Sequence, residues 1–295
     1  MSMKRPPYEL VDFGDGRKLE RFADTLFDRP APNAQGYTKA APSDWARAEV
    51  RYERGASVPG KDERNGQWTS DVPAPESWVL DMAHFSLQLR QTPFGHLGVF
   101  PEQIANWHWI RDQVSSLVHE AEEQPVRVLN LFAYTGGSTL AAACAGAELT
   151  HVDAAKNIVG WARQNAAGSG LADAPVRWIV EDAALFVRRE VKRGKSYEGI
   201  VLDPPSYGHG AAGQTWSIHK HLIPLLQDCG RLLRERGRFL LLTCHTPEFG
   251  PMELEALVQK YVQPSPSGRI TAHAGTISSA DGRTLPAGTV VRWTA

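Results

Sequence analysis

Residues 126–137 constrain the fold of this chain more than any other segment. The apolar run Val126–Leu131 has the length and composition of a buried strand. It leads into the turn Thr135-Gly136-Gly137, and an alanine-rich stretch after the turn predicts a helix. A strand, a glycine turn and a helix in this order are typical of open α/β sheets, where glycine lets the backbone pass close to a bound nucleotide.

The rest of the chain after residue 100 alternates in the same way. Apolar runs predict strands near 126–132, 149–153, 176–180, 198–203 and 237–243, and helical patterns fall near 101–121, 137–146, 156–168, 183–193, 216–235 and 251–262. Residues 269–277 and 289–293 predict a final hairpin around Asp281-Gly282. We therefore expect residues 101–295 to form a Rossmann-like α/β domain, with a mostly parallel sheet and an antiparallel last strand.

Residues 1–100 follow a different pattern, rich in proline, glycine, tryptophan and charge. Short alternating segments near 8–13, 48–52, 78–82 and 85–89 predict half-buried strands of a smaller antiparallel β module. We expect the proline-rich residues 28–44 to form an extended surface loop and residues 55–70 a long polar hairpin connection. This module is a candidate for binding the substrate.

Composition limits the possible classes of protein. A chain of 295 residues that is 42% hydrophobic can bury one large core, or one core and a smaller module. Its three cysteines form no CxxC pair, which favours a reducing compartment and predicts neither disulfides nor a metal site. The N-terminus has no signal pattern and no apolar run is long enough to cross a membrane, so we expect a soluble cytoplasmic protein. The net charge of −1 lacks the basic excess of many nucleic-acid-binding proteins.

Acidic residues follow three further predicted strands. Asp153 can accept hydrogen bonds from both hydroxyls of a ribose, and Asp182 can accept from an adenine amine, although either can also cap a helix. Asp203-Pro204-Pro205 ends an apolar strand with a rigid backbone that has no donors, and we expect its carbonyl groups to point outward toward a base or an amine. The carboxyl ends of parallel strands share one edge, where ligands of such sheets bind.

The bound group implied by this edge is S-adenosylmethionine. A dinucleotide needs a GxGxxG turn to seat its pyrophosphate, and the absence of that turn here argues against a dehydrogenase. S-adenosylmethionine has no phosphate, so one or two glycines are enough. Phe132 and Tyr134 fit core packing equally well, and the segment around Phe100 fits an interdomain linker. The residues that we expect to bind the cofactor are Phe100, Gln103, Asn130, Phe132, Ala133, Tyr134, Thr135, Gly136, Asp153, Ala154, Asp182, Ala183, Asp203, Pro204 and Pro205.

Cys244 ends the fifth predicted strand and is a candidate nucleophile. Carbon-5 of cytosine attacks a methyl group only after a thiolate has added to carbon-6, and a base then removes the carbon-5 proton. Asp203 would protonate or hydrogen-bond the ring nitrogen, and His245 would lower the thiol pKa. The alternative is that Cys244 is a small buried core residue, as free cysteines commonly are.

On these residues, the chain resembles the ribosomal RNA large-subunit methyltransferases of the class I S-adenosylmethionine-dependent enzymes, over roughly residues 78–295. The resemblance rests on Asn130 to Gly137, Asp153, Asp182, Asp203-Pro204-Pro205-Ser206, Thr243-Cys244 and Phe100-Pro101-Glu102-Gln103. It implies a class I methyltransferase fold, with Asp203 and Cys244 as catalytic residues and cytosine carbon-5 in ribosomal RNA as the acceptor. The sequence departs from the family in lacking a recognisable RNA-binding PUA domain, in His245 where serine is common, and in Ile104 where arginine is usual.

The leading hypothesis is therefore an RNA methyltransferase whose target base is flipped out of the RNA toward Asp203-Pro204-Pro205. The near-neutral charge and the missing PUA domain leave a small-molecule or protein methyltransferase as an alternative. A third possibility is a catalytically inactive module that binds S-adenosylmethionine or RNA.

Overall fold

The chain forms two compact units in a computed structural model that describes residues 6–55, 66–70, 77–121, 124–209, 215–262 and 268–295. The first unit contains residues Met1–Glu102 and Thr276–Ala287, and the second contains Gln103–Gly275 and Gly288–Ala295. The break after Glu102 lies close to the predicted boundary at residue 100. The tip of the C-terminal hairpin, however, belongs to the first unit, whereas the sequence placed the whole hairpin in the second domain.

The second unit is built on a seven-stranded sheet with the order β10-β9-β8-β11-β14-β16-β15. Five strands are parallel, and β16 pairs antiparallel with β14. The predicted mostly parallel sheet with an antiparallel last strand is confirmed. The strands are β8 (Arg127–Leu131), β9 (Glu148–Asp153), β10 (Val176–Val180), β11 (Gly199–Leu202), β14 (Phe239–Cys244), β15 (Arg269–Ser278) and β16 (Thr284–Thr294).

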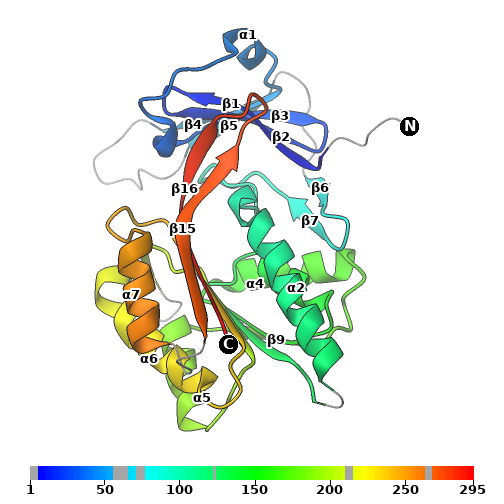
Figure 1. Cartoon of the computed structure of the whole chain (residues 1–295). Coiled ribbons are helices and arrows are strands. Elements are labelled where there is room, and N and C mark those ends of the chain that lie inside the picture. Colours follow the sequence, from blue (N-terminus) through cyan, green and yellow to red (C-terminus); the bar gives the residue numbers. More distant parts are fainter. Residues whose placement is uncertain (1–5, 56–65, 71–76, 122–123, 210–214, 263–267) are drawn as a thin grey trace. The chain divides into compact units, whose positions relative to one another are not determined.

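Helices cover both faces of this sheet, with α5, α6 and α7 on one side and α2 and α4 on the other (Figure 1). All residues of β11 and β14 are buried as a result, which explains their uninterrupted apolar sequences. The helices lie within a few residues of their predicted positions. They are α2 (Ile104–Glu120), α3 (Gly137–Ala143), α4 (Lys156–Gly168), α5 (Ala183–Lys192), α6 (Ile218–Leu233) and α7 (Pro251–Tyr261).

The order of the strands places a ligand site at the carboxyl ends of β8 and β11. From β8 the chain continues outward through β9 and β10, and it then crosses back to β11 on the other side of β8. The last residues of these strands are level, because Leu131 pairs with Leu202 of β11 and with Val152 of β9. Ligands of open α/β sheets bind where the direction of winding reverses in this way.

The first unit is a five-stranded sheet with the order β1-β2-β3-β4-β5 and a separate hairpin of β6 and β7. Neighbouring strands are antiparallel except for the parallel pair β3 and β4. Aromatic rings fill its core, where Phe27 lies 5.6 Å from Phe22 and 5.2 Å from Trp78 between ring centres. The strands are β1 (Tyr8–Gly14), β2 (Arg17–Phe22), β3 (Thr25–Pro30), β4 (Val50–Arg54), β5 (Gly66–Ser70), β6 (Trp78–Asp81) and β7 (Ser86–Leu89).

Two expectations for this unit are wrong. Residues 28–44 are not an extended surface loop, because they contain the end of β3, a 3₁₀ turn at η1 (Pro32–Ala34) and the short helix α1 (Pro42–Trp45), with Ala34 and Trp45 buried. Residues 66–70 form strand β5 and are not part of a hairpin connection. The rest of the expected connection, residues 56–65, lies outside the described residues.

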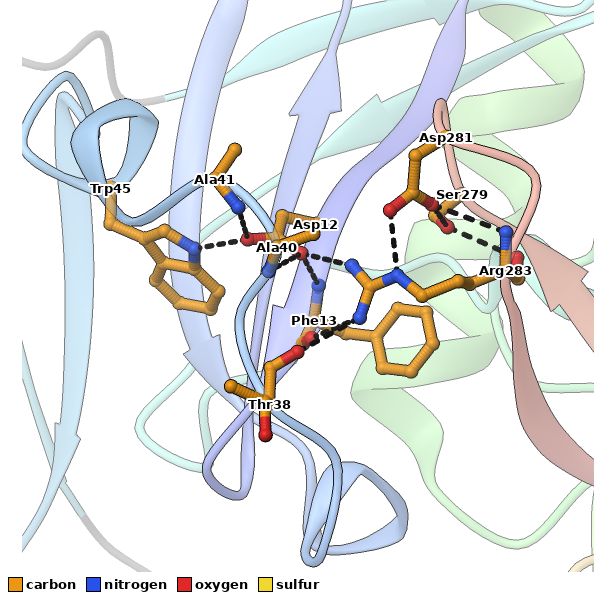
Figure 2. Close-up of polar contacts among 9 residues, drawn as sticks. All are labelled: Asp12, Phe13, Thr38, Ala40, Ala41, Trp45, Ser279, Asp281 and Arg283. Atoms are coloured by element: carbon orange, nitrogen blue, oxygen red, sulfur yellow. Dashed lines mark hydrogen bonds and ion pairs between the residues drawn. The ribbon is translucent and has the colours of Figure 1, made fainter.

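The tip of the C-terminal hairpin is anchored in the first unit by the buried carboxylate of Asp12 on β1. This carboxylate accepts hydrogen bonds from the amides of Ala40 (3.1 Å) and Ala41 (3.0 Å) and from the indole of Trp45 (2.7 Å), as Figure 2 shows. The guanidinium of Arg283 donates to the same carboxylate and also binds Asp281 at 2.6 Å (Figure 2). A buried acid is thus paired with one cation and several dipoles, as burial of a charge requires.

Among the described residues, no helix is both long and apolar enough to cross a membrane. Within the same residues, His, Cys, Asp and Glu side chains form no group of three that could hold a metal ion.

Candidate active site

The loop between β8 and α3 holds a costly backbone conformation at the carboxyl edge of the sheet. Phe132, Tyr134 and Gly136 have positive φ values of 54°, 49° and 93°. Such values are uncommon for residues other than glycine, and they persist only where the surroundings impose them. Two hydrogen bonds fix the loop. The amide of Ala133 donates to the carbonyl of Val152 at 3.1 Å, and the side-chain amide of Asn165 donates to the backbone carbonyl of Thr135 at 2.9 Å.

Asp153, the last residue of β9, faces this loop. Its carboxylate accepts hydrogen bonds from the backbone amides of Tyr134 (2.9 Å) and Ala155 (3.0 Å). Burial raises the pKa of Asp153, and the hydrogen bonds from the amides of Ala155, Tyr134 and Ala154 only partly counter that rise. Each carboxylate oxygen can accept a second hydrogen bond. The arrangement therefore leaves acceptors for two hydroxyl groups of a ligand.

Asn130 lies beneath the loop, inside the core. Its side chain is 3% exposed and donates to the hydroxyl of Thr139 at 2.9 Å, and that hydroxyl lies 2.9 Å from Nδ1 of His151. Burial lowers the pKa of His151 to about 3, so this histidine is neutral at ordinary pH. The structure thus places the Asn130 side chain in hydrogen bonds that join β8 to α3 and β9 and support the loop from below.

Three other predicted cofactor residues also have structural roles. Phe132 packs edge-on against the ring of Trp216, with 4.9 Å between ring centres. Asp182 caps helix α5, since its Oδ1 accepts the amide of Leu185 at 2.8 Å, and Ala183 is the buried first residue of that helix. Both roles foreseen for Asp182 remain compatible, because a carboxylate has a second oxygen.

The Asp203-Pro204-Pro205 segment is fixed by hydrogen bonds that the sequence did not reveal. The carbonyl of Pro205 accepts the indole N–H of Trp216 at 2.6 Å, and the carbonyl of Ser206 accepts the amide of Ile218 at 3.1 Å. The hydroxyl groups of Ser206 and Thr246 lie 2.6 Å apart. The expectation that the proline carbonyls point outward to a ligand is therefore wrong for Pro205, whose carbonyl already binds Trp216.

The two carboxylate oxygens of Asp203 have different surroundings. Its Oδ2 accepts a hydrogen bond from Nε2 of Gln103 at 3.1 Å, and the same Nε2 lies 3.1 Å from the hydroxyl of Thr243. Its Oδ1 is buried and has no hydrogen-bond partner among the described residues, although Nε2 of His245 lies 3.7 Å away. Gln103 thus comes together with Asp203, whereas Phe100 belongs to the first unit, with its ring 5.4 Å from that of His96.

Cys244 lacks the environment of an activated thiol. Its side chain is 1% exposed and belongs to the main core cluster of the second unit. Burial raises its pKa, and the charges of Asp203 and Glu248 add to that rise, while hydrogen bonds involving Thr246 partly counter it. The expectation that His245 lowers the thiol pKa is therefore wrong. No disulfide joins the three cysteines, all of which lie in the described part of the chain.

The chain is similar over nearly its whole length to a solved structure, the S-adenosylmethionine-dependent methyltransferase of Agrobacterium tumefaciens. The two are 34% identical with a TM-score of 0.88, over 98% of this chain and 90% of the other. The chain is an S-adenosylmethionine-dependent methyltransferase. A methyltransferase structure from Streptococcus mutans, 16% identical with a TM-score of 0.70 over 100% of this chain and 76% of the other, shows the same fold.

Other similarities of this methyltransferase cover less of the chain. A protein family described as "Conserved hypothetical protein 95" matches residues 107–225. The ribosomal RNA large subunit methyltransferases K/L of Vibrio cholerae and Shewanella frigidimarina are 30% and 31% identical over 131 and 134 residues. These segments are 44% and 45% of this chain, but only 18% of the length of each relative.

S-adenosylmethionine is thus the cofactor of this methyltransferase, and that prediction is confirmed. The residues at the edge of the sheet fit its chemistry. They offer one glycine turn and the carboxylates of Asp153, Asp182 and Asp203, which suit a ligand that carries a ribose, an amine and a positive sulfonium but no phosphate.

Proposed function

We propose that this enzyme methylates a base in RNA, with ribosomal RNA of the large subunit as the first substrate to test. The names of the K/L relatives support RNA as the substrate. The observation that carries the proposal is the buried Oδ1 of Asp203, which accepts no hydrogen bond from the described residues and lies on a rigid segment at the ligand edge of the sheet. An acceptor so placed suits an N–H group brought to the edge by base flipping.

For the cofactor, we infer that Asp153 binds the ribose hydroxyls and that the second oxygen of Asp182 accepts from the adenine amine. Ala154 and Ala183 lie next to these acids in the sequence, and residues 132–136 form the adjoining loop. When bound, S-adenosylmethionine supplies an electrophilic methyl group on a sulfonium. The task of the protein is then to hold the acceptor in line with that methyl group and to keep water away.

Tyr207 is the side chain that we propose to stack on the flipped base. It begins the short strand β12 (Tyr207–His209), which pairs with β13 (Thr215–Ser217), and its side chain is 56% exposed. An exposed aromatic ring is available to stack on a base, and such stacking contributes about 1–3 kcal/mol in single-stranded recognition. Tyr207 follows Ser206 directly, so it lies close to the Asp203 segment along the chain.

We further propose an exocyclic amine as the acceptor, in preference to carbon-5 of cytosine. The carbon-5 route needs a thiolate, and Cys244 is buried with a raised pKa. An amine needs no covalent intermediate, because its nitrogen attacks the methyl carbon as the carbon–sulfur bond breaks and S-adenosylhomocysteine leaves. The proton lost from the nitrogen would pass to Oδ1 of Asp203 or to water.

In the first unit, we propose that a cleft of about 220 Å³ contacts the RNA. Lys18, Arg29 and Arg54 line it together with His96 and with Phe94, which is 50% exposed. The pKa of His96 is lowered to about 4, first by burial and then by the charges of Arg29, Lys18 and Arg54. Lys18 and Arg29 are paired with the buried Glu20, and Glu102 also lines the cleft, so Arg54 is the cation on which the proposed contact depends. Cations beside an exposed aromatic ring suit a phosphate and its neighbouring base.

The test is incubation with methyl-labelled S-adenosylmethionine and one of three substrates: ribosomal RNA from cells that lack this protein, a metabolite extract, or a protein extract. Nucleoside mass spectrometry then identifies the methylated base. We expect label in RNA, at least tenfold less with Tyr207→Ala, and an unchanged rate with Met252→Ala, which alters another exposed apolar side chain (78% exposed).

Two results would overturn the proposal. Label only in metabolites or proteins would replace RNA as the substrate, and cofactor binding without any transfer would indicate an inactive module.

For the cleft, Arg54→Glu is expected to weaken RNA binding severalfold without changing cofactor affinity. Arg47→Glu is the matched control on an exposed arginine of the same unit (68% exposed).

A further inference from the structure

Three side chains of the second unit form a chain of hydrogen bonds that ends on Asp203. Nη2 of Arg292 on β16 donates to Oδ1 of Asn106 at 2.7 Å. Nδ2 of Asn106 on α2 donates to Oε1 of Gln103 at 2.8 Å, and Nε2 of Gln103 donates to Oδ2 of Asp203 at 3.1 Å. Gln103 and Asn106 are 8% and 2% exposed, so water competes little for these bonds.

The two ends of this chain determine how the amides between them are oriented. A guanidinium can only donate hydrogen bonds, and an ionised carboxylate can only accept them. Oδ1 of Asn106 must therefore face Arg292, which turns its Nδ2 toward Gln103. The oxygen of Gln103 is then taken by Asn106, and its Nε2 is directed at Asp203 and at the hydroxyl of Thr243.

We propose that Gln103, Asn106 and Arg292 are positioning residues for methyl transfer, which hold Asp203 so that Oδ1 alone faces the acceptor. This inference rests on the proposed role of Asp203 toward the acceptor. It gives Gln103 a task different from the contact with the cofactor that the sequence suggested, and it adds Asn106 and Arg292 to the site. The donor from Gln103 holds Oδ2, while Oδ1 accepts no hydrogen bond from the described residues and lies 3.7 Å from Nε2 of His245.

The sharpest variant is Asn106→Asp, which has almost the same shape but no donor. Its carboxylate would keep the bond to Arg292 and repel Oε1 of Gln103, so the Gln103 amide should flip and present its oxygen to Asp203. Gln103→Leu removes the donor directly, and Arg292→Met removes the group that fixes the orientation. Gln113→Glu, another amide-to-acid change on α2, is the matched control.

In single-turnover methyl transfer to ribosomal RNA, we expect Asn106→Asp and Gln103→Leu to lower the rate constant about tenfold or more. The dissociation constant for S-adenosylmethionine, measured by calorimetry, should change less than about threefold, because Asp153 and Asp182, which we propose bind its ribose and its adenine, are untouched. Equal weakening of cofactor binding would show that Gln103 is a cofactor contact, and an unchanged rate would overturn the positioning role.

A second measurement does not depend on activity. In the full chain labelled with ¹⁵N-glutamine, the side-chain NH₂ signal of Gln103 is the one that disappears in Gln103→Leu. We expect this signal to shift in Asp203→Ala and in Asn106→Asp, and to stay unchanged in Gln113→Glu. A signal that ignores both substitutions would refute the network. If wild-type enzyme transfers no methyl group to RNA while the signal shifts as expected, the proposed substrate fails and the network stands.

Discussion

The backbone amide of Tyr134 donates a hydrogen bond of 2.9 Å to the carboxylate of Asp153. Tyr134 has a positive φ of 49°, which is unfavourable for a residue other than glycine. The residue that donates this hydrogen bond is thus one of those that hold the loop in its unfavourable conformation. The acid therefore has two roles at the edge of the sheet. It stabilises the loop after β8 and, in the proposed site, it binds the ribose of the cofactor.

Asp153→Asn should weaken the binding of S-adenosylmethionine about 10- to 100-fold. The substitution keeps the size of the side chain but replaces one acceptor oxygen by a donor, which faces either a backbone amide or a ribose hydroxyl. Calorimetric titration of the full chain with S-adenosylmethionine measures the effect. Asp112→Asn, at an exposed position on α2 (68% exposed), should bind the cofactor normally. Equal affinities for both variants would remove Asp153 from the cofactor site.

Cofactor binding should also depend on pH through Asp153. Burial raises its pKa, and a carboxyl with a higher pKa in the folded than in the unfolded protein binds protons more tightly when folded. Its contribution to the free energy of unfolding is thus largest below the unfolded value of about 4 and is lost as the pH rises through the folded value. The charged form is the better acceptor for the ribose. We therefore expect affinity to fall as acidification passes the raised pKa, and to lose this dependence in Asp153→Asn.

Gly136→Ala should destabilise the second unit by about 1–2 kcal/mol and weaken cofactor binding. Gly136 has a φ of +93°, and an added Cβ would lie 3.2 Å from the Cβ of Ala162. Gly160→Ala is the matched control. Gly160 lies exposed inside helix α4 with nothing within 4 Å of the new Cβ, so this change should stabilise by about 0.5–1 kcal/mol. Urea unfolding of both variants separates backbone strain from the mere addition of a methyl group.

The elements of the second unit were predictable because parallel buried strands leave a clear pattern in the sequence. Each strand of this kind is a short apolar run, and each amphipathic helix between two runs repeats its apolar residues at a different period. Residues 156–168 were expected to be a helix and are helix α4 (Lys156–Gly168). The positions of Asp153 and Asp203 followed from the same pattern, because the residue at which an apolar run ends lies at the carboxyl edge of the sheet.

Strands β2 and β3 were not predicted, because their charges conceal the alternation. Glu20 on β2 is 0% exposed and is paired with Arg29 on β3 at 2.6 Å and with Lys18 at 3.0 Å. Asp15-Gly16 was the available signal, because this dipeptide favours the tight turn that joins β1 to β2, and both residues have positive φ. The bond between Gln103 and Asp203 had no local signal, since contacts between distant segments leave none in either sequence.

Cys244→Ala should leave methyl transfer within about threefold of wild type if the acceptor is an amine. The thiol is buried in the core, so its loss should appear as a decrease in the free energy of unfolding of about 1–2 kcal/mol. Transfer kinetics with ribosomal RNA and urea unfolding measure the two effects. Cys229→Ala, at a cysteine buried in α6, is the matched control. Complete loss of transfer in a folded Cys244→Ala protein would restore the covalent carbon-5 route.

Asp12→Ala should destabilise the first unit by about 2–4 kcal/mol, because it removes the acceptor of the buried Trp45 indole and of the partly buried bonds from the amides of Ala40 and Ala41, and it leaves Arg283 without this carboxylate. Arg283→Met should cost less, about 1 kcal/mol, since the guanidinium is partly exposed. Amide hydrogen exchange of residues 8–14 in the full chain reports on this unit specifically. Arg47→Met, at an exposed arginine of the same unit (68% exposed), should leave that exchange unchanged.

Acidification should weaken the hydrogen bonds of the Asp12 carboxylate to Trp45, Ala40, Ala41 and Arg283. Burial alone would raise the pKa of Asp12, but hydrogen bonds from Trp45, Ala41, Ala40 and Arg283 outweigh that effect and lower it. A carboxyl with a lowered pKa stabilises the folded state above its unfolded value of about 4, and this contribution is lost as the pH falls through the folded value. The protection of residues 8–14 against amide exchange, corrected for the intrinsic pH dependence of exchange, should therefore fall below about pH 4 in wild type. In Asp12→Asn it should lack that acid-dependent step, whereas an identical step in both proteins would show that other groups cause it.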